Sequence, residues 1–130
     1  MKHLHSFDEL RQINRKIVYA LGTFDGVHRG HQRVIGNAIA EAKAHDAVTV
    51  LVTFSAHPMT ILRPGDVPKR VLSADIMDEI LESLKVDYIL RLPMNLDIFN
   101  MSPDEFLNAL CRDIDVVGIA IGTNFTFGAK

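Results

Sequence analysis

The chain has 130 residues, which fits one domain of ordinary size, and its 48% hydrophobic residues supply enough apolar material for one core. A net charge of −2 argues against a nucleic-acid partner, and no apolar run approaches the roughly 18–20 residues that a membrane span needs. The single cysteine, Cys111, excludes an intrachain disulfide and a multi-cysteine metal site.

The first residues, 1–10, are charged and polar where a signal peptide would carry its apolar stretch, so we expect a cytoplasmic protein. Four β-rich runs follow along the chain, and all but the third are almost continuously apolar. Strands that are buried on both faces of a parallel sheet have this composition. The predicted strands cover residues 17–21, 48–54, 88–92 and 116–121.

Three amphipathic patterns lie between these runs and predict helices. Ser73 is a candidate N-cap of the second helix, and Ser102-Pro103-Asp104-Glu105 forms a capping box at the start of the third. Cys111 falls near the apolar stripe of the third helix, so we expect it to pack rather than to react. The stripes are Val34, Ile35, Ala38, Ile39 and Ala42 in the first helix, Ile76, Met77, Ile80, Leu81 and Leu84 in the second, and Phe106, Leu107, Leu110 and Ile114 in the third.

The alternation of strands and helices predicts an α/β fold, with a parallel sheet flanked by helices in one domain over residues 1–130. The longest irregular stretch, residues 55–72, contains Pro58, Pro64, Gly65 and Pro68, so it reads as a loop. A loop of that length in a compact domain is more often functional than idle.

A glycine-rich segment, residues 22–31, joins the first predicted strand to the first predicted helix. Ligands bind outside the carboxyl ends of the strands in open α/β sheets, and a helix N-terminus favours an anion. The glycines allow close backbone approach, and the imidazoles of His28 and His31, which flank Gly30, can donate hydrogen bonds to phosphate oxygens. The segment therefore predicts a phosphate site.

Other interpretations of this segment have weaker support. It lacks the Gly-Lys-Ser/Thr of a Walker loop and the glycine spacing of the dinucleotide fingerprint. The glycines can serve turn geometry alone, with both histidines on the surface. A zinc site would need a third ligand, and none is obvious nearby in the sequence.

Three segments resemble the prokaryotic FAD synthetases, whose adenylyltransferase module has a Rossmann-like nucleotidylyltransferase fold. Residues 22–32 are similar to the GxFDGVHxGHQ signature of that family. Residues 53–58 resemble its TFxxHP segment, and residues 122–128 resemble its GxNFxFG segment. Each segment lies at the end of a predicted strand, so we expect all three at the same edge of the sheet.

The resemblance implies that the chain transfers AMP from ATP to FMN, giving FAD and pyrophosphate by direct in-line displacement. Such a reaction needs no protein nucleophile, so catalysis rests on positioning and charge neutralisation. The resemblance also implies catalytic roles for His28 and His31, and Mg²⁺ that bridges the ATP phosphates without an identified protein ligand. The implied nucleotide-binding residues are Gly22, Thr23, Phe24, Asp25, Gly26, His28, Gly30 and His31, and the implied flavin-binding residues are Phe54, His57, Pro58, Asn124 and Phe127.

The flavin-side residues also have plain structural explanations. Phe54 can be a core residue, His57-Pro58 can form a turn, and Asn124 can cap the local backbone. The interpretation of Phe127 as a flavin contact, rather than Phe125, rests on the resemblance alone.

The chain departs from the family at some positions. Ser55 and Ala56 replace an acidic residue and a proline, and the chain ends at Lys130, before a Ser/Thr-rich motif ending in arginine and before a riboflavin kinase module. A partial domain with weak or no activity is therefore expected. Two alternatives stay open: a non-catalytic remnant that binds nucleotide or flavin, and a transferase that acts on another small phosphate ester. Nothing in the sequence predicts the oligomeric state.

Overall fold

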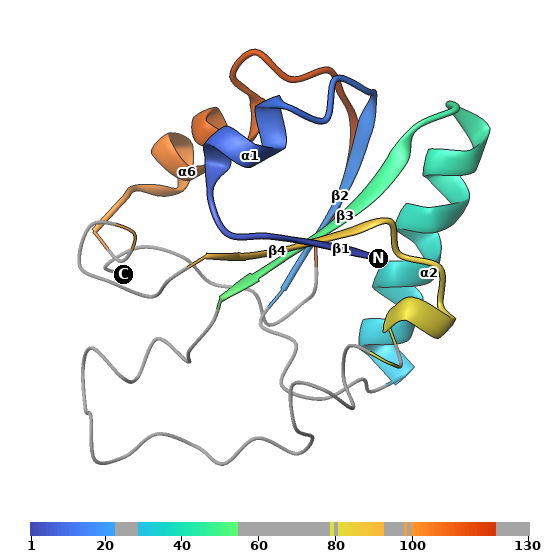
Figure 1. Ribbon diagram of the computed structural model, residues 1–130. Helices are drawn as coiled ribbons and strands as arrows, with labels where there is room; N and C mark the ends of the chain where they lie inside the picture. Colours follow the sequence, from blue (N-terminus) through green and yellow to red (C-terminus); the bar gives the residue numbers. More distant parts are fainter. Residues whose placement is uncertain (23–28, 55–78, 80, 93–97, 99, 122–130) are drawn as a thin grey trace, which may run out of the picture.

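A computed structural model describes residues 1–22, 29–54, 79, 81–92, 98 and 100–121 of the chain. These residues form one β-sheet with helices on both of its faces (Figure 1). Along the chain the elements are β1 (Lys2–Leu4), α1 (Phe7–Arg11), β2 (Ile17–Leu21), α2 (Arg29–Ala44), β3 (Val48–Phe54), β4 (Tyr88–Leu92), α6 (Pro103–Cys111) and β5 (Val116–Ile121).

The sheet has five strands in the order β1-β4-β3-β2-β5, and every neighbouring pair is parallel. The predicted α/β fold with a parallel sheet is confirmed, and β2 to β5 have the predicted bounds. The sequence did not predict β1 and α1. β1 has only 3 residues, and the exposed side chains of Lys2 and His3 give it a polar composition.

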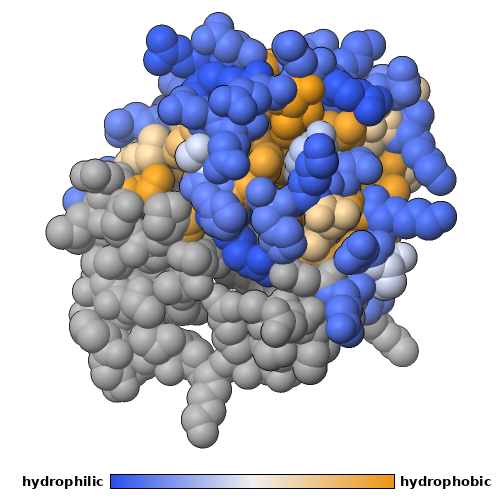
Figure 2. Space-filling view, viewed as in Figure 1, coloured by the Kyte–Doolittle hydropathy of each residue, from blue (hydrophilic) through white to orange (hydrophobic). Residues whose placement is uncertain are grey.

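Two apolar cores lie on opposite faces of the sheet. α1 and α6 cover one face and α2 covers the other (Figure 1). On the face seen in Figure 2, apolar side chains form small areas between hydrophilic ones. Within the described residues, no helix combines the length and the apolar composition of a membrane span. The first core includes Leu10, Tyr19, Leu90, Phe106 and Leu110, and the second includes Val18, Ile35, Ala38, Leu51 and Leu81.

The predicted apolar stripe of α6 is only partly right. Phe106 and Leu110 are buried, and the predicted capping box at Ser102 is present. Leu107, however, is 37% exposed, and Cys111 is exposed rather than packed. These two predictions are wrong because α6 packs on the sheet with the narrow side that carries Phe106 and Leu110. Leu107 and Cys111 each directly follow one of these buried residues and lie on another side of the helix. For the second predicted helix, Ser73 and the apolar residues Ile76, Met77 and Ile80 lie outside the described residues, as does the loop over residues 55–72.

β5 corrects a further prediction. Its apolar sequence suggested burial on both faces, but Ile119 is 37% exposed and Ile121 is 55% exposed. β5 pairs with β2 on one side only and lies at the edge of the described sheet. Composition cannot show which strand takes an edge position, because strand order depends on contacts between distant segments.

A Schellman motif closes the helical turn before β4. The Val86 N–H donates to the Leu81 carbonyl at 3.3 Å, the Lys85 N–H donates to the Glu82 carbonyl at 3.0 Å, and Lys85 has a φ of 69°. Glycine adopts this conformation without the cost of about 1 kcal/mol that a Cβ brings. We therefore expect Lys85→Gly to raise the free energy of unfolding, measured by urea denaturation. Lys85→Ala keeps the Cβ and should give no gain, and an equal gain from both variants would refute this explanation.

Candidate functional site

The strand order reverses at β2, and such a reversal marks the binding crevice in open α/β sheets. From β2 the chain moves outward to β3 and β4, and it then returns to place β5 on the other side of β2. Leu21 and Ile121, the last residues of β2 and β5, are partners in register. Two of the three family segments, residues 22–32 and 122–128, follow these two paired residues in the sequence.

The carboxyl edge of the sheet is stepped. Leu21 at the end of β2 is in register with Ile121 of β5 and with Val52 of β3. β3 continues to Phe54, which is in register with Leu92 at the end of β4. β3 and β4 thus extend two residues further, or roughly 7 Å. The ends of β2 and β5 therefore lie two residues short of the ends of β3 and β4.

The start of α2 lies at this same edge, because α2 follows β2 and leads back to β3. Its first turn contains Gly30 and His31 and no acidic residue. The first N–H groups of a helix lack intrahelical partners, and the helix dipole is positive there. Gly22 is buried, and its N–H donates to the Val52 carbonyl at 3.2 Å. A fixed strand end and a positively polarised helix start therefore bracket residues 23–28.

The described residues include only some of the predicted site residues. Gly22 follows the end of β2, Gly30 and His31 belong to the first turn of α2, and Phe54 is the last residue of β3. Their positions agree with a site at the carboxyl edge, but their contacts with ligands stay predictions. The side chains of His31 and Phe54 lie outside the described part, and so do Thr23, Phe24, Asp25, Gly26, His28, His57, Pro58, Asn124 and Phe127.

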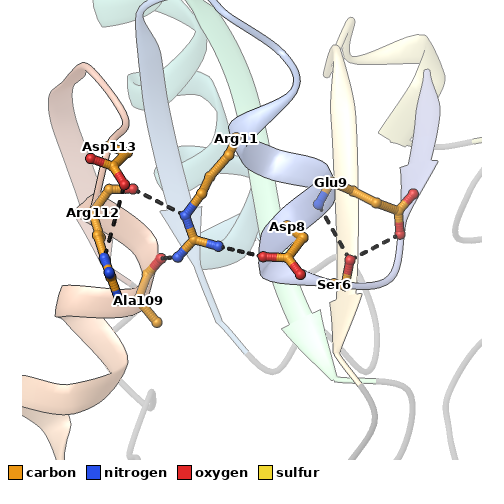
Figure 3. A network of polar contacts seen from close by, with 7 residues as sticks. All are labelled: Ser6, Asp8, Glu9, Arg11, Ala109, Arg112 and Asp113. Atoms are coloured by element: carbon orange, nitrogen blue, oxygen red, sulfur yellow. Dashed lines mark hydrogen bonds and ion pairs between the residues drawn. The ribbon is translucent and has the colours of Figure 1, made fainter.

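A separate polar network lies between α1 and the end of α6 (Figure 3). The Arg11 guanidinium donates to the Asp8 carboxylate at 2.8 Å, to the Arg112 carbonyl at 3.3 Å and to the Ala109 carbonyl at 3.4 Å. The C-terminus of a helix favours a cation. Arg11 therefore joins the two helices, and its charge serves the fold rather than a ligand.

A hollow of about 330 Å³ opens beside this network, and its lining includes Arg11, Lys16, Asp113 and Asp115. Lys16 directly precedes β2 and Asp115 directly precedes β5, so the hollow lies at the amino edge of the sheet. Both signs of charge share it, and it lies at the opposite edge from the carboxyl ends of the strands. The carboxyl edge is therefore the candidate site.

Tyr19 is a buried titratable group on β2, and its role is structural. Its hydroxyl donates to the Leu110 carbonyl at 2.6 Å. Burial raises the pKa of Tyr19 well above its ordinary value, and the nearby Cys111 adds to the rise. The hydroxyl thus stays protonated and ties β2 to α6.

The fold and the site together define a class. A parallel sheet whose order reverses at a strand, followed by a loop with glycines and histidines and then a helix, is the arrangement of the Rossmann-like nucleotidylyltransferases. The match with a family model makes the assignment specific. The chain belongs to the FAD synthetase family, whose model matches residues 10–130.

The chain is similar to two bifunctional riboflavin kinase/FMN adenylyltransferases. It is 32% identical over 131 residues to that of Buchnera aphidicola subsp. Schizaphis graminum, covering 100% of this chain and 42% of the relative. It is 31% identical over 126 residues to that of Bacillus subtilis, covering 95% and 40%. The chain thus spans about two fifths of the length of these relatives.

A solved structure of a macrolide-efflux protein from Streptococcus pneumoniae also resembles the chain. The TM-score is 0.84 at 23% identity, and the likeness covers 97% of this chain and 42% of the other. At this identity the likeness shows a shared fold and carries no argument about function.

Proposed function

We propose that the chain carries FMN adenylyltransferase activity and converts FMN to FAD. A phosphate oxygen of FMN attacks the α-phosphorus of ATP, the bond from that phosphorus to the bridging oxygen breaks, and pyrophosphate leaves with the bridging oxygen. The observation that carries the proposal is the place of the family signature, residues 22–32, which follows the end of β2 at the strand-order reversal and includes the first turn of α2. Positioning and charge neutralisation are what this reaction requires of a protein.

The nucleotide lies at the ends of β2 and β5. In this proposal the imidazoles of His28 and His31 donate to the ATP phosphates and stabilise the charge that develops there. The N–H groups at the start of α2 add to this stabilisation. Gly22, Gly26 and Gly30 give the backbone close access to the nucleotide, and the side chains that shape the pocket are Thr23, Phe24 and Asp25.

The flavin lies towards the ends of β3 and β5. The longer β3 supports this assignment, because its last residue, Phe54, lies two residues beyond the ends of β2 and β5 and so beside the proposed place of the nucleotide. The proposed flavin contacts are Phe54, His57, Pro58, Asn124 and Phe127.

Mg²⁺ accompanies ATP in this proposal. Among the residues that the structure describes, no group of three His, Cys, Asp or Glu side chains could hold a metal ion. Mg²⁺ is commonly bound through substrate phosphates and water, with one or two carboxylates. The ATP phosphates would thus supply most of its ligands. We also propose that the chain forms the adenylyltransferase module of its family and that it works in the cytoplasm.

The protein expressed from its complete gene is expected to form FAD and pyrophosphate in equal amounts from FMN and Mg²⁺-ATP, measured by chromatography and a pyrophosphate assay. FMN should be preferred over other small phosphate esters by at least about a hundredfold in kcat/KM, because the family segments after β3 and β5 would contact the flavin. A clear preference for another acceptor would contradict the proposal that FMN is the substrate. Binding of both substrates without turnover would make the chain a non-catalytic binding module.

A further inference from the structure

Thr53 is a buried polar residue near the carboxyl end of β3. Only 6% of its surface is exposed, and among the described residues Thr49 is the other polar residue that is buried. Side chains alternate along a strand, and Leu51 packs in the core beneath α2. Thr49 and Thr53 therefore face the α2 side of the sheet, Thr49 near the amino end of β3 and Thr53 near its carboxyl end.

Thr53 lies beside the start of the family signature. Leu21 is in register with Val52, and the Gly22 N–H continues the ladder by donating to the Val52 carbonyl at 3.2 Å. The next residue of β3, Thr53, is thus adjacent to Gly22. α2 packs on the same face of the sheet and begins at Arg29, at the same edge. The Thr53 side chain and the N-terminus of α2 therefore share one face and one edge of the sheet.

The neighbouring strands carry small side chains on this face. Along β2, Val18 and Ala20 pack beneath α2, and Gly22 follows them at the edge, while Ala120 of β5 packs in the same core. Ala20, Gly22 and Ala120 offer no side chain larger than a methyl group. The described residues of β2 and β5 thus place no large side chain beside Thr53 on this face.

The Thr53 hydroxyl has a free hydrogen-bonding capacity. No hydrogen bond joins it to another described residue, and the described part contains no fully enclosed side-chain nitrogen or oxygen without a partner. The hydroxyl oxygen must therefore reach solvent through the small exposed part of the side chain. Burying a hydroxyl without a partner is unfavourable, and valine would fill the same space. A bound ligand at this edge could use the Thr53 hydroxyl as a donor, whereas Thr49 lies at the other end of β3.

We infer that the Thr53 hydroxyl donates a hydrogen bond to a phosphate oxygen of the bound substrate. This inference rests on the proposed function and adds a polar contact from β3 to it. A phosphate at the start of α2 lies on the same face and edge as Thr53, so one phosphate group can accept from the helix N–H groups and from the hydroxyl. The phosphate belongs to ATP or to FMN, and the hydrogen-bond chemistry is the same for both.

The test compares Thr53→Val with Thr49→Val in the protein expressed from its complete gene. Each change removes a hydroxyl and keeps the shape of the side chain, and the two sites lie on the same face of β3, about 13 Å apart. We expect Thr53→Val to weaken the binding of one substrate about tenfold or more, because hydrogen bonds to charged groups are among the stronger ones. Thr49→Val should leave both dissociation constants within about twofold of the wild type. Calorimetry with Mg²⁺-ATP and with FMN, in separate titrations, shows which phosphate Thr53 contacts.

Two more variants keep the test decisive. Thr53→Ser retains the donor and should recover the binding that Thr53→Val loses, and Thr53→Ala repeats the loss with a smaller side chain if valine disturbs the packing. Equal affinities for Thr53→Val, Thr53→Ala and Thr49→Val would overturn the inference and leave the proposed function intact. A wild type that binds neither Mg²⁺-ATP nor FMN would instead overturn the proposed function, and the inference with it.

Discussion

Replacing His28 or His31 by alanine is expected to lower the rate of FAD formation by at least about a hundredfold, because a preorganised donor at a developing charge contributes two to three orders of magnitude. Each imidazole is proposed to donate to phosphate oxygens that gain negative charge as the α-phosphorus is attacked. The measurement is kcat/KM for FMN and for Mg²⁺-ATP in each single variant. The double variant should lose less than the product of the two single losses, since both histidines act on one phosphate group.

His45 supplies a matched control for these variants. It is exposed and directly follows α2, whose 16 residues place it roughly 24 Å from the start of that helix. His45→Ala should keep the wild-type rate, and circular dichroism should show the same fold in every variant. Turnover that survives the loss of both His28 and His31 would remove the basis of the assignment.

Local sequence patterns predicted most of the elements because the relevant physics is local. A mostly apolar run such as residues 48–54 is stable as a strand when both of its faces are buried, and β3 has these bounds. The capping box of α6 is encoded within four residues. Ser102 and Glu105 each accept a hydrogen bond at 3.1 Å from the N–H group of the other.

β1 shows where local patterns fail. Its 3 residues pair with Tyr88–Leu90 of β4, far along the chain, and this pairing rather than composition makes Lys2–Leu4 a strand. The prediction that Ile119 and Ile121 are buried fails for the same reason, since their burial depends on the order of the strands. The exposure of Leu107 and Cys111 could not be predicted without knowing which side of α6 packs on the sheet.

The place of the candidate site could be predicted from the sequence, but the arrangement of the strand ends around it could not. The family signature is contiguous in the sequence and follows a strand, so its place at the carboxyl edge could be predicted. The reversal at β2, the two-residue step at the end of β3 and the closeness of Thr53 to Gly22 all depend on which strands are neighbours. Thr53 begins the TFxxHP-like segment, but it was not among the predicted site residues.

Phe106→Ala is expected to lower the free energy of unfolding by about 3–5 kcal/mol, the usual cost of removing a buried aromatic ring. Phe106 is 1% exposed, and its ring meets that of Phe7 edge to face with 6.0 Å between the centroids. The change removes this contact and leaves a cavity between α6, α1 and the sheet. Urea unfolding, followed by circular dichroism, measures the loss.

Leu107→Ala is the control for this change. Leu107 is the next residue of the same helix and is 37% exposed, so its loss should cost about 1 kcal/mol or less. Equal losses for the two variants would mean that α6 packs with a different side towards the sheet. Because a domain is commonly stable by only about 5–15 kcal/mol, the Phe106→Ala protein should unfold at a clearly lower temperature than the wild type. α6 leads directly into β5, so substrate binding at the end of β5 should then disappear at the temperature at which α6 unfolds.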